Sequence, residues 1–211
     1  MRVKSEKRRL AILEAGKSVF LERGYDAASM AEVAVRAGGS KQTLYHYFGS
    51  KEALFVAVML EKGAAQVGPL FDSFHQNQDL RAALADFAIK FLRFIAQDEI
   101  LGFRRVIYAE GPRSDLGKLF FENGRKPGLS RLAEDFAVAM DEGRMRRADP
   151  WRAVVQFHAL IEAGPFQRLL EGAIASAPDA DLVEAAAAAV ETFARAYDIG
   201  SVALSPASDP A

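Results

Sequence analysis

The sequence predicts an all-α protein, and three observations support that prediction. Apolar residues recur at the three- and four-residue spacing of a helix along most of the 211 residues. Glycine and proline pairs, such as Gly38-Gly39 and Gly111-Pro112, separate these stretches where helices are expected to end. No segment shows the alternation of apolar and polar residues that is typical of a half-buried strand. We therefore expect an N-terminal three-helix bundle and a larger C-terminal helical domain.

A short helix is predicted over residues 30–37. Its apolar residues form one stripe along the helix, consisting of Met30, Val33, Ala34 and Ala37. Ser29 precedes this helix and Glu32 follows three positions later. The hydroxyl and the carboxylate can then each satisfy a free amide at the helix start, as in a capping box. Gly38 and Gly39 end the helix, since glycine tolerates the positive φ of many helix termini.

A second short helix follows the glycine turn, with Ser40 as its N-cap. If Leu44 faces the core, Gln42 and His46 point nearly opposite it, with Thr43 and Tyr45 on the flanks. These outward side chains are of the types that contact base edges and phosphates. Lys41 is unfavourable for the helix dipole but well placed for a phosphate or a guanine. This pair of helices therefore predicts a helix-turn-helix that reads DNA.

The charge distribution points to the same end of the chain. Residues 1–51 carry ten Lys and Arg against five Asp and Glu, whereas residues 52–211 carry seventeen against twenty-three. The net charge of −1 therefore hides a basic N-terminal part, which would attract a polyanion. Two interpretations of the first basic residues remain open, an arm that lies along a DNA groove and a charged, frayed N-terminus. These residues are Arg2, Lys4, Lys7, Arg8 and Arg9.

Further helices are expected along the rest of the chain. The fourth begins at a Ser50 cap and runs toward Gly63, with Pro69 as the next interruption. Later helices are predicted over residues 80–96, 100–109, 116–123, 129–142, 150 to about 170, and 179 to about 198. Gly124 and Pro127 are expected to interrupt the chain between two of these helices. Residues 200–211 have little to bury, and we expect them to be disordered.

Composition and motif content exclude several classes of protein. The chain has no cysteine, which excludes disulfides and cysteine-based metal sites. It shows no apolar signal core and no run of about 18 apolar residues, so we expect a soluble, cytoplasmic protein that does not enter a membrane. Hydrolase, metalloprotease and phosphate-loop motifs are absent, and the three histidines lie far apart. We therefore expect no enzymatic activity, no metal and no cofactor.

Residues 10–60 resemble the DNA-binding domain of the TetR/AcrR family of bacterial transcriptional repressors. The similarity rests on Ile12-Leu13-Glu14-Ala15, Phe20, Gly24-Tyr25, Ser29-Met30, Val33-Ala34, Ala37-Gly38, Ser40-Lys41, Thr43-Leu44-Tyr45, Tyr47-Phe48 and residues 50–55. Two positions depart from the family pattern. Gly39 replaces an apolar β-branched residue that usually plugs the turn, so the turn is expected to be looser. Ala28 replaces a frequent threonine and leaves its capping or phosphate contact to Ser29.

Residues 101–172 resemble the C-terminal domain of AefR-like members of this family. The similar segments are residues 105–113, Leu116-Gly117, residues 141–144 and residues 147–150. The resemblance implies a helix-turn-helix domain over residues 1–52, an effector-binding and dimerisation domain over residues 53–199, and a tail over residues 200–211. It also implies a homodimer in which the last two helices pair with their copies. The final helix carries Val183, Val190, Phe193 and Tyr197 among alanines, which suits close helix packing.

The resemblance also implies roles for individual residues. Base-edge contacts are expected from Gln42, Tyr45 and Lys41, phosphate contacts from Thr43, Tyr47, Ser29 and Lys51, and a DNA contact or a neighbouring position for His46. For Tyr47, packing against the first helix is an equal alternative. The expected effector-binding residues are Phe87, Phe91, Phe103, Tyr108, Phe157, His158 and Glu162. For the aromatic residues the competing interpretation is ordinary core packing, and for His158 with Glu162 it is a local hydrogen bond.

Taken with the residues themselves, the resemblance predicts a ligand-responsive repressor. The dimer would bind a roughly palindromic DNA operator, and a small apolar or aromatic effector would release it. By linkage, the effector and the operator must weaken each other's binding equally. Two alternatives stay open, a C-terminal domain that recruits a protein partner and a regulator that activates transcription.

Overall fold

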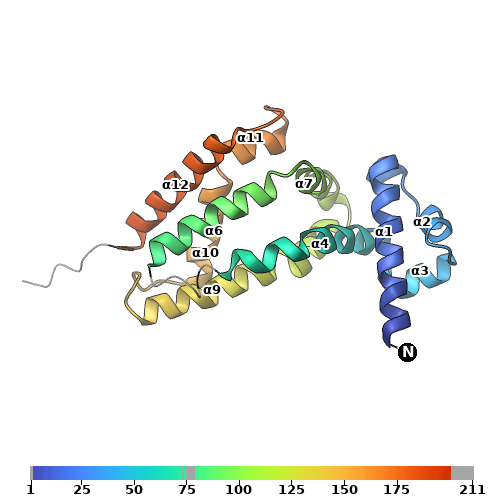
Figure 1. The fold of residues 1–211 in the computed structure, drawn as a ribbon, viewed down its shortest axis with the longest axis horizontal. Helices are drawn as coiled ribbons and strands as arrows, with labels where there is room; N and C mark the ends of the chain where they lie inside the picture. Colours follow the sequence, from blue (N-terminus) through green and yellow to red (C-terminus); the bar gives the residue numbers. More distant parts are fainter. Residues whose placement is uncertain (1, 73, 75–78, 201–211) are drawn as a thin grey trace, which may run out of the picture. The chain divides into compact units, whose positions relative to one another are not determined.

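The computed structural model describes residues 2–72, 74 and 79–200, and these residues form helices joined by short connections (Figure 1). No strand occurs among them, which confirms the all-α prediction. The predicted disordered tail, residues 200–211, lies outside the described residues except for Gly200. The helices are α1 (Arg2–Ala27), α2 (Met30–Arg36), α3 (Lys41–Phe48), α4 (Lys51–Leu70), α6 (Leu80–Ile95), α7 (Asp98–Glu110), α8 (Leu116–Phe120), α9 (Lys126–Asp141), α10 (Pro150–Glu162), α11 (Pro165–Glu171) and α12 (Asp179–Ala196).

The chain forms two compact units, and each is built from two separate stretches of sequence. The first unit contains Met1–Pro69 and Phe94–Gly128, and the second contains Leu70–Arg93 and Leu129–Ala211. The first unit therefore holds α1 to α4 together with α7 and α8. The functional boundary predicted between residues 52 and 53 does not coincide with this packing, and it stays a prediction about function.

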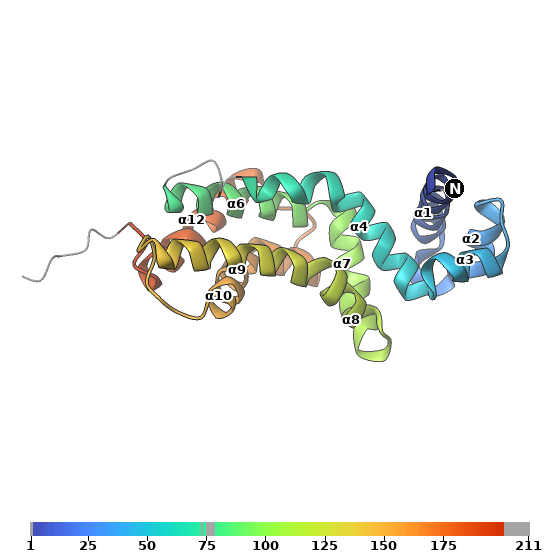
Figure 2. The same ribbon diagram turned by 90° about the horizontal axis from the view of Figure 1, so that it is seen from below.

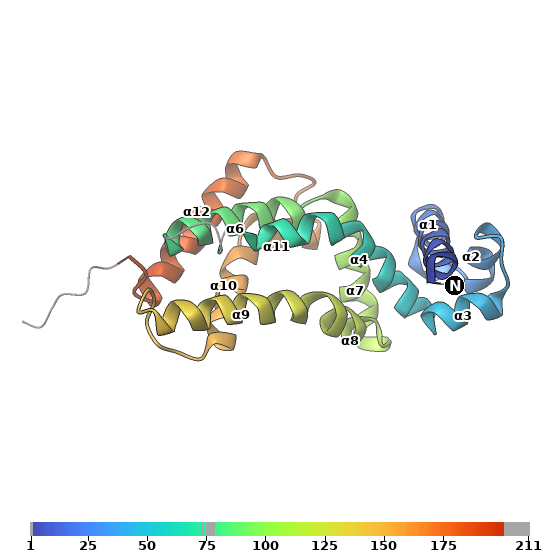
Figure 3. The ribbon, with the colours of Figure 1, turned by 60° about the horizontal axis from the view of Figure 1, so that its bottom comes forward.

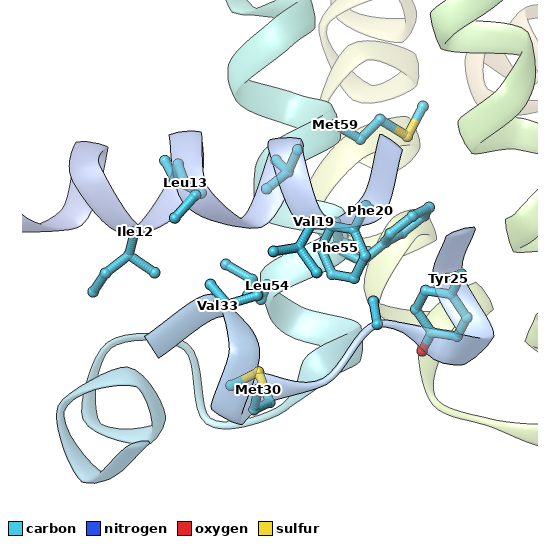
Figure 4. Close-up of a cluster of buried hydrophobic side chains, with 14 of the residues drawn as sticks. Ile12, Leu13, Val19, Phe20, Tyr25, Met30, Val33, Leu54, Phe55 and Met59 are labelled. Atoms are coloured by element: carbon cyan, nitrogen blue, oxygen red, sulfur yellow. The ribbon is translucent and has the colours of Figure 1, made fainter. Parts of the chain in front are cut away.

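The core of the first unit lies where α1, α2 and α4 meet (Figure 4). Three aromatic rings form its centre: Phe55 of α4 meets Phe20 and Tyr25 of α1 edge to face, at centroid distances of 5.1 and 4.9 Å. The surrounding side chains include Ile12, Leu13, Val19, Met30, Val33, Leu54 and Met59. Burial of this many apolar side chains is the main contribution that holds α2, and through it α3, against α1.

Helix α7 packs beside α4 in the same unit (Figure 2). Phe103 of α7 meets Phe55 edge to face at 5.1 Å, so α7 extends the same core. Nearer the end of α4, the Lys62 ammonium lies 2.8 Å from the Glu99 carboxylate. The side-chain amides of Gln66 and Gln97 also bond to each other, at 2.7 Å for the shorter bond.

Helix α4 is long and apolar enough, by length and composition alone, to pass a test for a membrane span. This does not contradict the expectation that the chain has no run of about 18 apolar residues, because α4 itself contains Glu52, Glu61 and Lys62. In addition, α4 buries Leu54, Phe55 and Val58 in the core of its own unit. A core helix has the same composition as a membrane span, so the test does not separate the two.

The second unit has its own aromatic core, to which α9, α10 and α12 contribute. Phe136, Phe157 and Phe193 are fully buried, and the Phe193 ring lies 5.5 Å from Phe136 and 4.8 Å from Phe157. Helix α6 lies along α12 (Figure 3). The two helices are joined by a two-pronged ion pair in which Arg93 donates to both carboxylate oxygens of Asp179 at 2.7 Å.

Three expected helix boundaries are wrong. The fourth helix, expected to run toward Gly63 with an interruption at Pro69, continues as α4 to Leu70 and contains Pro69. The helix expected from residue 150 to about 170 is broken, because Gly164 has φ 82° and ψ −123°, a conformation open only to glycine, and Pro165 then starts α11. Conversely, Gly124 and Pro127 do not interrupt the chain. A π-helical turn at Phe121–Arg125 leads directly into α9, and Pro127, which has no amide hydrogen to donate, follows this turn as the second residue of α9.

Candidate nucleic-acid interface

The caps of α2 confirm half of the predicted capping box. Ser29 is extended, and its hydroxyl accepts a hydrogen bond from the Glu32 amide at 3.1 Å. The Glu32 carboxylate accepts instead from Arg23 of α1, at 3.2 Å. The side chain that was expected to complete the cap therefore ties α2 to α1.

The turn between α2 and α3 has the geometry of a glycine-terminated helix. Gly38 has φ 66°, and its amide donates to Val35 at 3.0 Å. The Gly39 amide reaches back to the Ala34 carbonyl at 2.9 Å. These paired bonds form the Schellman motif, in which the residue at the position of Gly38 must adopt a left-handed conformation. The turn predicted from the glycine pair is confirmed.

Helix α3 begins at Ser40, whose hydroxyl accepts from the Thr43 amide at 3.1 Å. The same hydroxyl lies 2.9 Å from the Thr43 hydroxyl. Leu44 is only 1% exposed and fixes the rotation of the helix, because it is the residue of α3 buried in the core. The opposite face is therefore presented to solvent.

The structure leaves four of the predicted DNA-binding side chains exposed on α3, namely Lys41, Gln42, Tyr45 and His46. Tyr45 is 43% exposed, and the Lys41 ammonium lies 5.8 Å from the centre of its ring. A cation beside an aromatic hydroxyl, on a helix that shows no acidic residue, provides donors for base edges and phosphates.

The other predicted DNA-binding residues are more engaged with the protein. Thr43 bonds to Ser40, and the Tyr47 ring packs on the apolar core, 5.9 Å from His46. This packing of the ring is compatible with both expected roles of Tyr47, so both stay predictions. Ser29 is exposed, although its hydroxyl accepts the capping bond.

Lys51 lies at the start of α4, and its ammonium is held by the protein itself. It donates to the carbonyls of Asp26 and Ala28, at 3.2 and 3.1 Å, and lies 4.4 Å from the centre of the Tyr25 ring. The Tyr25 hydroxyl in turn donates to Glu52 at 3.2 Å. Burial and the nearby Glu52 carboxylate raise the pKa of Tyr25 well above its usual value, so the hydroxyl stays protonated as a donor.

A second ion pair ties α2 to α1. Arg36 donates to both carboxylate oxygens of Glu22, at 2.5 and 2.8 Å, and also to the Ser18 hydroxyl at 2.9 Å. The hydrogen bonds from Arg36 lower the pKa of Glu22, and the same pairing raises the pKa of Arg36. Both charges are therefore held at every ordinary pH.

Arg8 contacts the turn between α2 and α3, a contact that was not predicted from the sequence. Arg8 of α1 donates to the Ala37 carbonyl at 2.9 Å, and its guanidinium lies over Gly39. The sequence placed Arg8 only in a basic N-terminal run. No local pattern links residue 8 to residue 37, so only the packing of α1 against the turn reveals the contact.

The predicted effector-binding residues do not all lie in one unit. In the second unit Phe87 stacks on Phe91 at 5.7 Å, and Phe91 meets His158 edge to face at 4.7 Å. The imidazole Nδ1 of His158 is 3.5 Å from the Glu162 carboxylate, and Phe157 lies 6.2 Å from Phe87. These five residues therefore form one connected cluster.

The remaining two predicted effector-binding residues belong to the first unit. Phe103 is buried against Phe55, in the core shared by α4 and α7. The side chain of Tyr108 is 53% exposed. Phe103 and Tyr108 therefore belong to a different unit from the Phe91–His158 cluster.

A shallow groove lies between α12 and the connection from α10 to α11 in the second unit, with a volume of about 470 Å³. Small side chains line much of it, including Ala163, Ala185 and Ala188, and the carboxylates of Asp181 and Glu184 line it as well. Phe193 of α12 is fully buried in the core of its unit. The exposed side of α12 at the groove therefore combines alanines with two acidic side chains.

Two family models match the chain. The model of the bacterial regulatory proteins of the tetR family matches residues 12–58, and the model of the C-terminal domain of AefR-like transcriptional repressors matches residues 82–199. The second match covers more than half of the chain. Together the two matches include α2 and α3 and most of the second unit.

Solved structures and known relatives agree with these models. A TetR-family transcriptional regulator from Mesorhizobium loti is 27% identical, covers 92% of this chain and 98% of its own, and has a TM-score of 0.77. The flavonoid-responsive regulator FrrA is 28% identical, covers 93% of this chain and 100% of its own, and has a TM-score of 0.71. The transcriptional activator FasR of Mycolicibacterium smegmatis is 37% identical over 97 residues, which are 46% of this chain and only 44% of FasR.

Proposed function

Because the chain belongs to the tetR family of bacterial regulatory proteins, we propose that it represses transcription by binding a palindromic operator through α3 and is released by a small effector. The observation that carries the DNA-binding part is the exposed face of α3. Lys41, Gln42 and Tyr45 project from a helix whose opposite side is anchored by Leu44. A helix capped and fixed in this way can enter a major groove without reorganising.

The side chains of this face have separate roles in the proposal. Gln42 and Tyr45 contact base edges, and Lys41 contacts a guanine or a phosphate. Ser29, Thr43 and Tyr47 contact phosphates that set the register, and His46 lies beside them. Lys51 reaches a phosphate only if its ammonium leaves the carbonyls of the α1–α2 connection.

The test measures binding of the protein to the intergenic DNA upstream of its gene. Binding is monitored by fluorescence anisotropy over a series of salt concentrations. We expect nanomolar binding that weakens with salt, because several phosphates are neutralised. A Lys41→Ala, Tyr45→Ala double variant is expected to bind at least a hundredfold more weakly, since two groove contacts are lost. Weak binding that is equal in both proteins would refute the assignment of α3.

A dimer would present two copies of α3 to successive major grooves. The spacing needed is about 34–36 Å or a multiple of it, which is why the operator is proposed to be palindromic. The small side chains of Ala185 and Ala188 on α12 allow close approach of a second copy of the helix, and they leave apolar surface that a partner would cover. We place the dimer contact there.

The proposed effector site is the cluster of Phe91, His158 and Glu162 in the second unit. Its aromatic side suits a flat apolar ligand, and the buried histidine–glutamate pair can exchange a hydrogen bond with a ligand hydroxyl. The name of the flavonoid-responsive relative FrrA supports an aromatic compound with hydroxyl groups. Such an effector would act in the cytoplasm, where the operator is.

This assignment is tested by calorimetry with a panel of flavonoids, simple phenols and fatty acids. We expect a phenolic compound to bind and to lower operator affinity, and His158→Ala to weaken that binding while operator affinity in the absence of ligand is unchanged. Tight binding of a phenolic compound that His158→Ala leaves unaltered would place the effector elsewhere.

One observation favours activation as a second candidate function, since the relative FasR is named a transcriptional activator. Transcription from the upstream promoter, measured in cells with and without the gene, distinguishes the two signs. Repression predicts higher transcription in the deletion strain, and activation predicts lower transcription.

A further inference from the structure

A side chain from α1 contacts the turn between α2 and α3. The Arg8 guanidinium, on α1, reaches the turn after α2, and its Nη1 donates to the Ala37 carbonyl at 2.9 Å. Ala37 is the C-cap of α2, where carbonyl groups lack partners within the helix. A cation at a helix C-terminus also lies in the favourable field of the helix dipole.

The same guanidinium occupies the space in front of Gly39. A Cβ atom built on Gly39 would lie 1.8 Å from Arg8 Nη2 and 3.0 Å from Arg8 Cζ, which is far inside van der Waals contact. Gly39, unlike Gly38, is not among the positive-φ glycines, so its backbone does not itself demand glycine. What its lack of a side chain provides at this position is room for Arg8.

We infer that Arg8 and Gly39 act as a pair. The arginine of α1 fills the space at Gly39, where the turn has no side chain of its own, and its hydrogen bond holds the turn in place. Arg8 is thus a positioning residue for α3, because Ser40 and Lys41 follow Gly39 directly. The inference rests on the proposed function for its DNA readout. It also corrects the expectation that Gly39 loosens the turn, because the missing side chain is replaced by one from another helix.

Other contacts between α1 and α2 lie elsewhere and do not duplicate this one. Glu22 with Arg36 and Arg23 with Glu32 join the second half of α1 to α2. Arg8 comes from the first half of α1, and its contacts are with the turn. Loss of Arg8 is therefore expected to free the start of α3 while the core and the other ion pairs remain.

The experiment compares five proteins: the wild type, Arg8→Ala, Gly39→Val, the Arg8→Ala, Gly39→Val double variant, and Arg9→Ala. Arg9 is the matched control, because it carries the same charge one position later but pairs with Glu6 and Glu61 instead of the turn. Operator affinity is measured across a salt series, and amide hydrogen exchange is measured without DNA at Gly39 and Thr43, whose amides are bonded in the turn and in the cap of α3.

We expect Arg8→Ala to weaken operator binding roughly tenfold, as for a lost charged hydrogen bond, with the salt slope unchanged. Exchange at Gly39 and Thr43 should become faster. The double variant should regain most of the lost affinity and protection, because valine fills the space that Arg8 left. Arg9→Ala should change neither measurement more than about twofold.

Three results would overturn the inference. A salt slope that falls by about 0.9 for each lost contact would make Arg8 a phosphate ligand. Equal losses in Arg8→Ala and Arg9→Ala would reduce the effect to general charge. If the double variant loses operator affinity by the product of the two single-variant factors, the two positions act independently and do not share one space. If the wild type binds no operator, the proposed function fails, but hydrogen exchange still decides the role of Arg8.

Discussion

At the scale of single residues, two lysines of the N-terminal unit have the same predicted function but different surroundings. Lys41 is exposed on α3, beside Tyr45. Lys51 is partly buried, and its ammonium donates to two backbone carbonyls. A side chain that bonds to backbone carbonyls contributes to stability, whereas an exposed one on the helix proposed to read DNA is expected to contribute to affinity.

This difference predicts opposite effects for the matched variants Lys41→Met and Lys51→Met. Lys51→Met is expected to lower the free energy of unfolding by about 1–2 kcal/mol, because two carbonyls lose their donor. Lys41→Met should change that free energy by less than about 0.5 kcal/mol but weaken operator binding about tenfold. Thermal unfolding and anisotropy measure the two effects. Unchanged stability with weakened DNA binding in Lys51→Met would make Lys51 a phosphate contact after all.

The predictability of individual site residues depended on how local their contacts are. Ser29, Ser40 and Gly38 were predictable because a cap or a left-handed turn involves only residues within five positions. The contacts of Arg8 and Lys51 span 29 and up to 25 residues, and no spacing in the sequence encodes them. The exposed face of α3 was predictable because one buried residue, Leu44, determines it.

At the scale of helices, starts were easier to predict than interruptions. Asp149 followed by Pro150 marks the start of α10, and the Asp149 carboxylate accepts from the Arg152 amide at 2.8 Å. The break at Gly164 was missed, although Gly164-Pro165 is a breaking pair, because apolar spacing continues across it. The π-helical turn at Phe121–Arg125 was also missed, since its wider hydrogen bonding has no sequence signature.

The break between α10 and α11 predicts that two glycine substitutions change the free energy of unfolding in opposite directions. Gly164→Ala forces a side chain into a conformation open only to glycine, and it should lower the free energy of unfolding by about 1–3 kcal/mol. Gly102→Ala, inside α7 and facing open space, should raise that free energy by about 0.5–1 kcal/mol. Chemical denaturation of both variants tests this. A destabilised Gly102→Ala, or a neutral Gly164→Ala, would contradict it.

The ion pair that ties α2 to α1 predicts an acid-sensitive step. Glu22 has a pKa lowered from the ordinary value of 4.5 by hydrogen bonds from Arg36. Its contribution to stability is therefore present above about pH 4.5 and is lost as the pH falls through the lowered value. The melting temperature of the wild type should fall more steeply below pH 4.5 than that of Glu22→Gln. Parallel curves for the two proteins would show that the pair does not stabilise α2.

At the scale of the whole molecule, the chain separates two tasks by composition. Its first 51 residues are basic, with ten cationic against five acidic residues, and the following 160 are acidic on balance. A polyanion is therefore attracted to one end only, and association with DNA should depend strongly on ionic strength. In the second unit, α12 leaves Ala185 and Ala188 uncovered beside Asp181 and Glu184, so apolar surface is available there for assembly.

This surface predicts how the molecule assembles. Ala188 lines the groove on α12, whereas Ala187, its exposed neighbour on the same helix, does not. Ala188→Glu places a charge in a close helix contact, where it would lose its hydration without a partner, so we expect the dimer to dissociate into monomers. Ala187→Glu makes the same chemical change outside the groove and should leave the dimer intact. Light scattering after size-exclusion chromatography gives the mass of each variant.

The assembly also decides operator affinity, because each monomer has one α3 and a palindrome offers two half-sites. If Ala188→Glu is monomeric but folded, as circular dichroism would show, its affinity for a single half-site should match that of the wild type. Its affinity for the full palindrome should be lower by two or more orders of magnitude, because two linked contacts bind far more tightly than one. Equal loss on half-site and palindrome would mean that the substitution damages α3 itself, and an intact dimer would place the interface on another face.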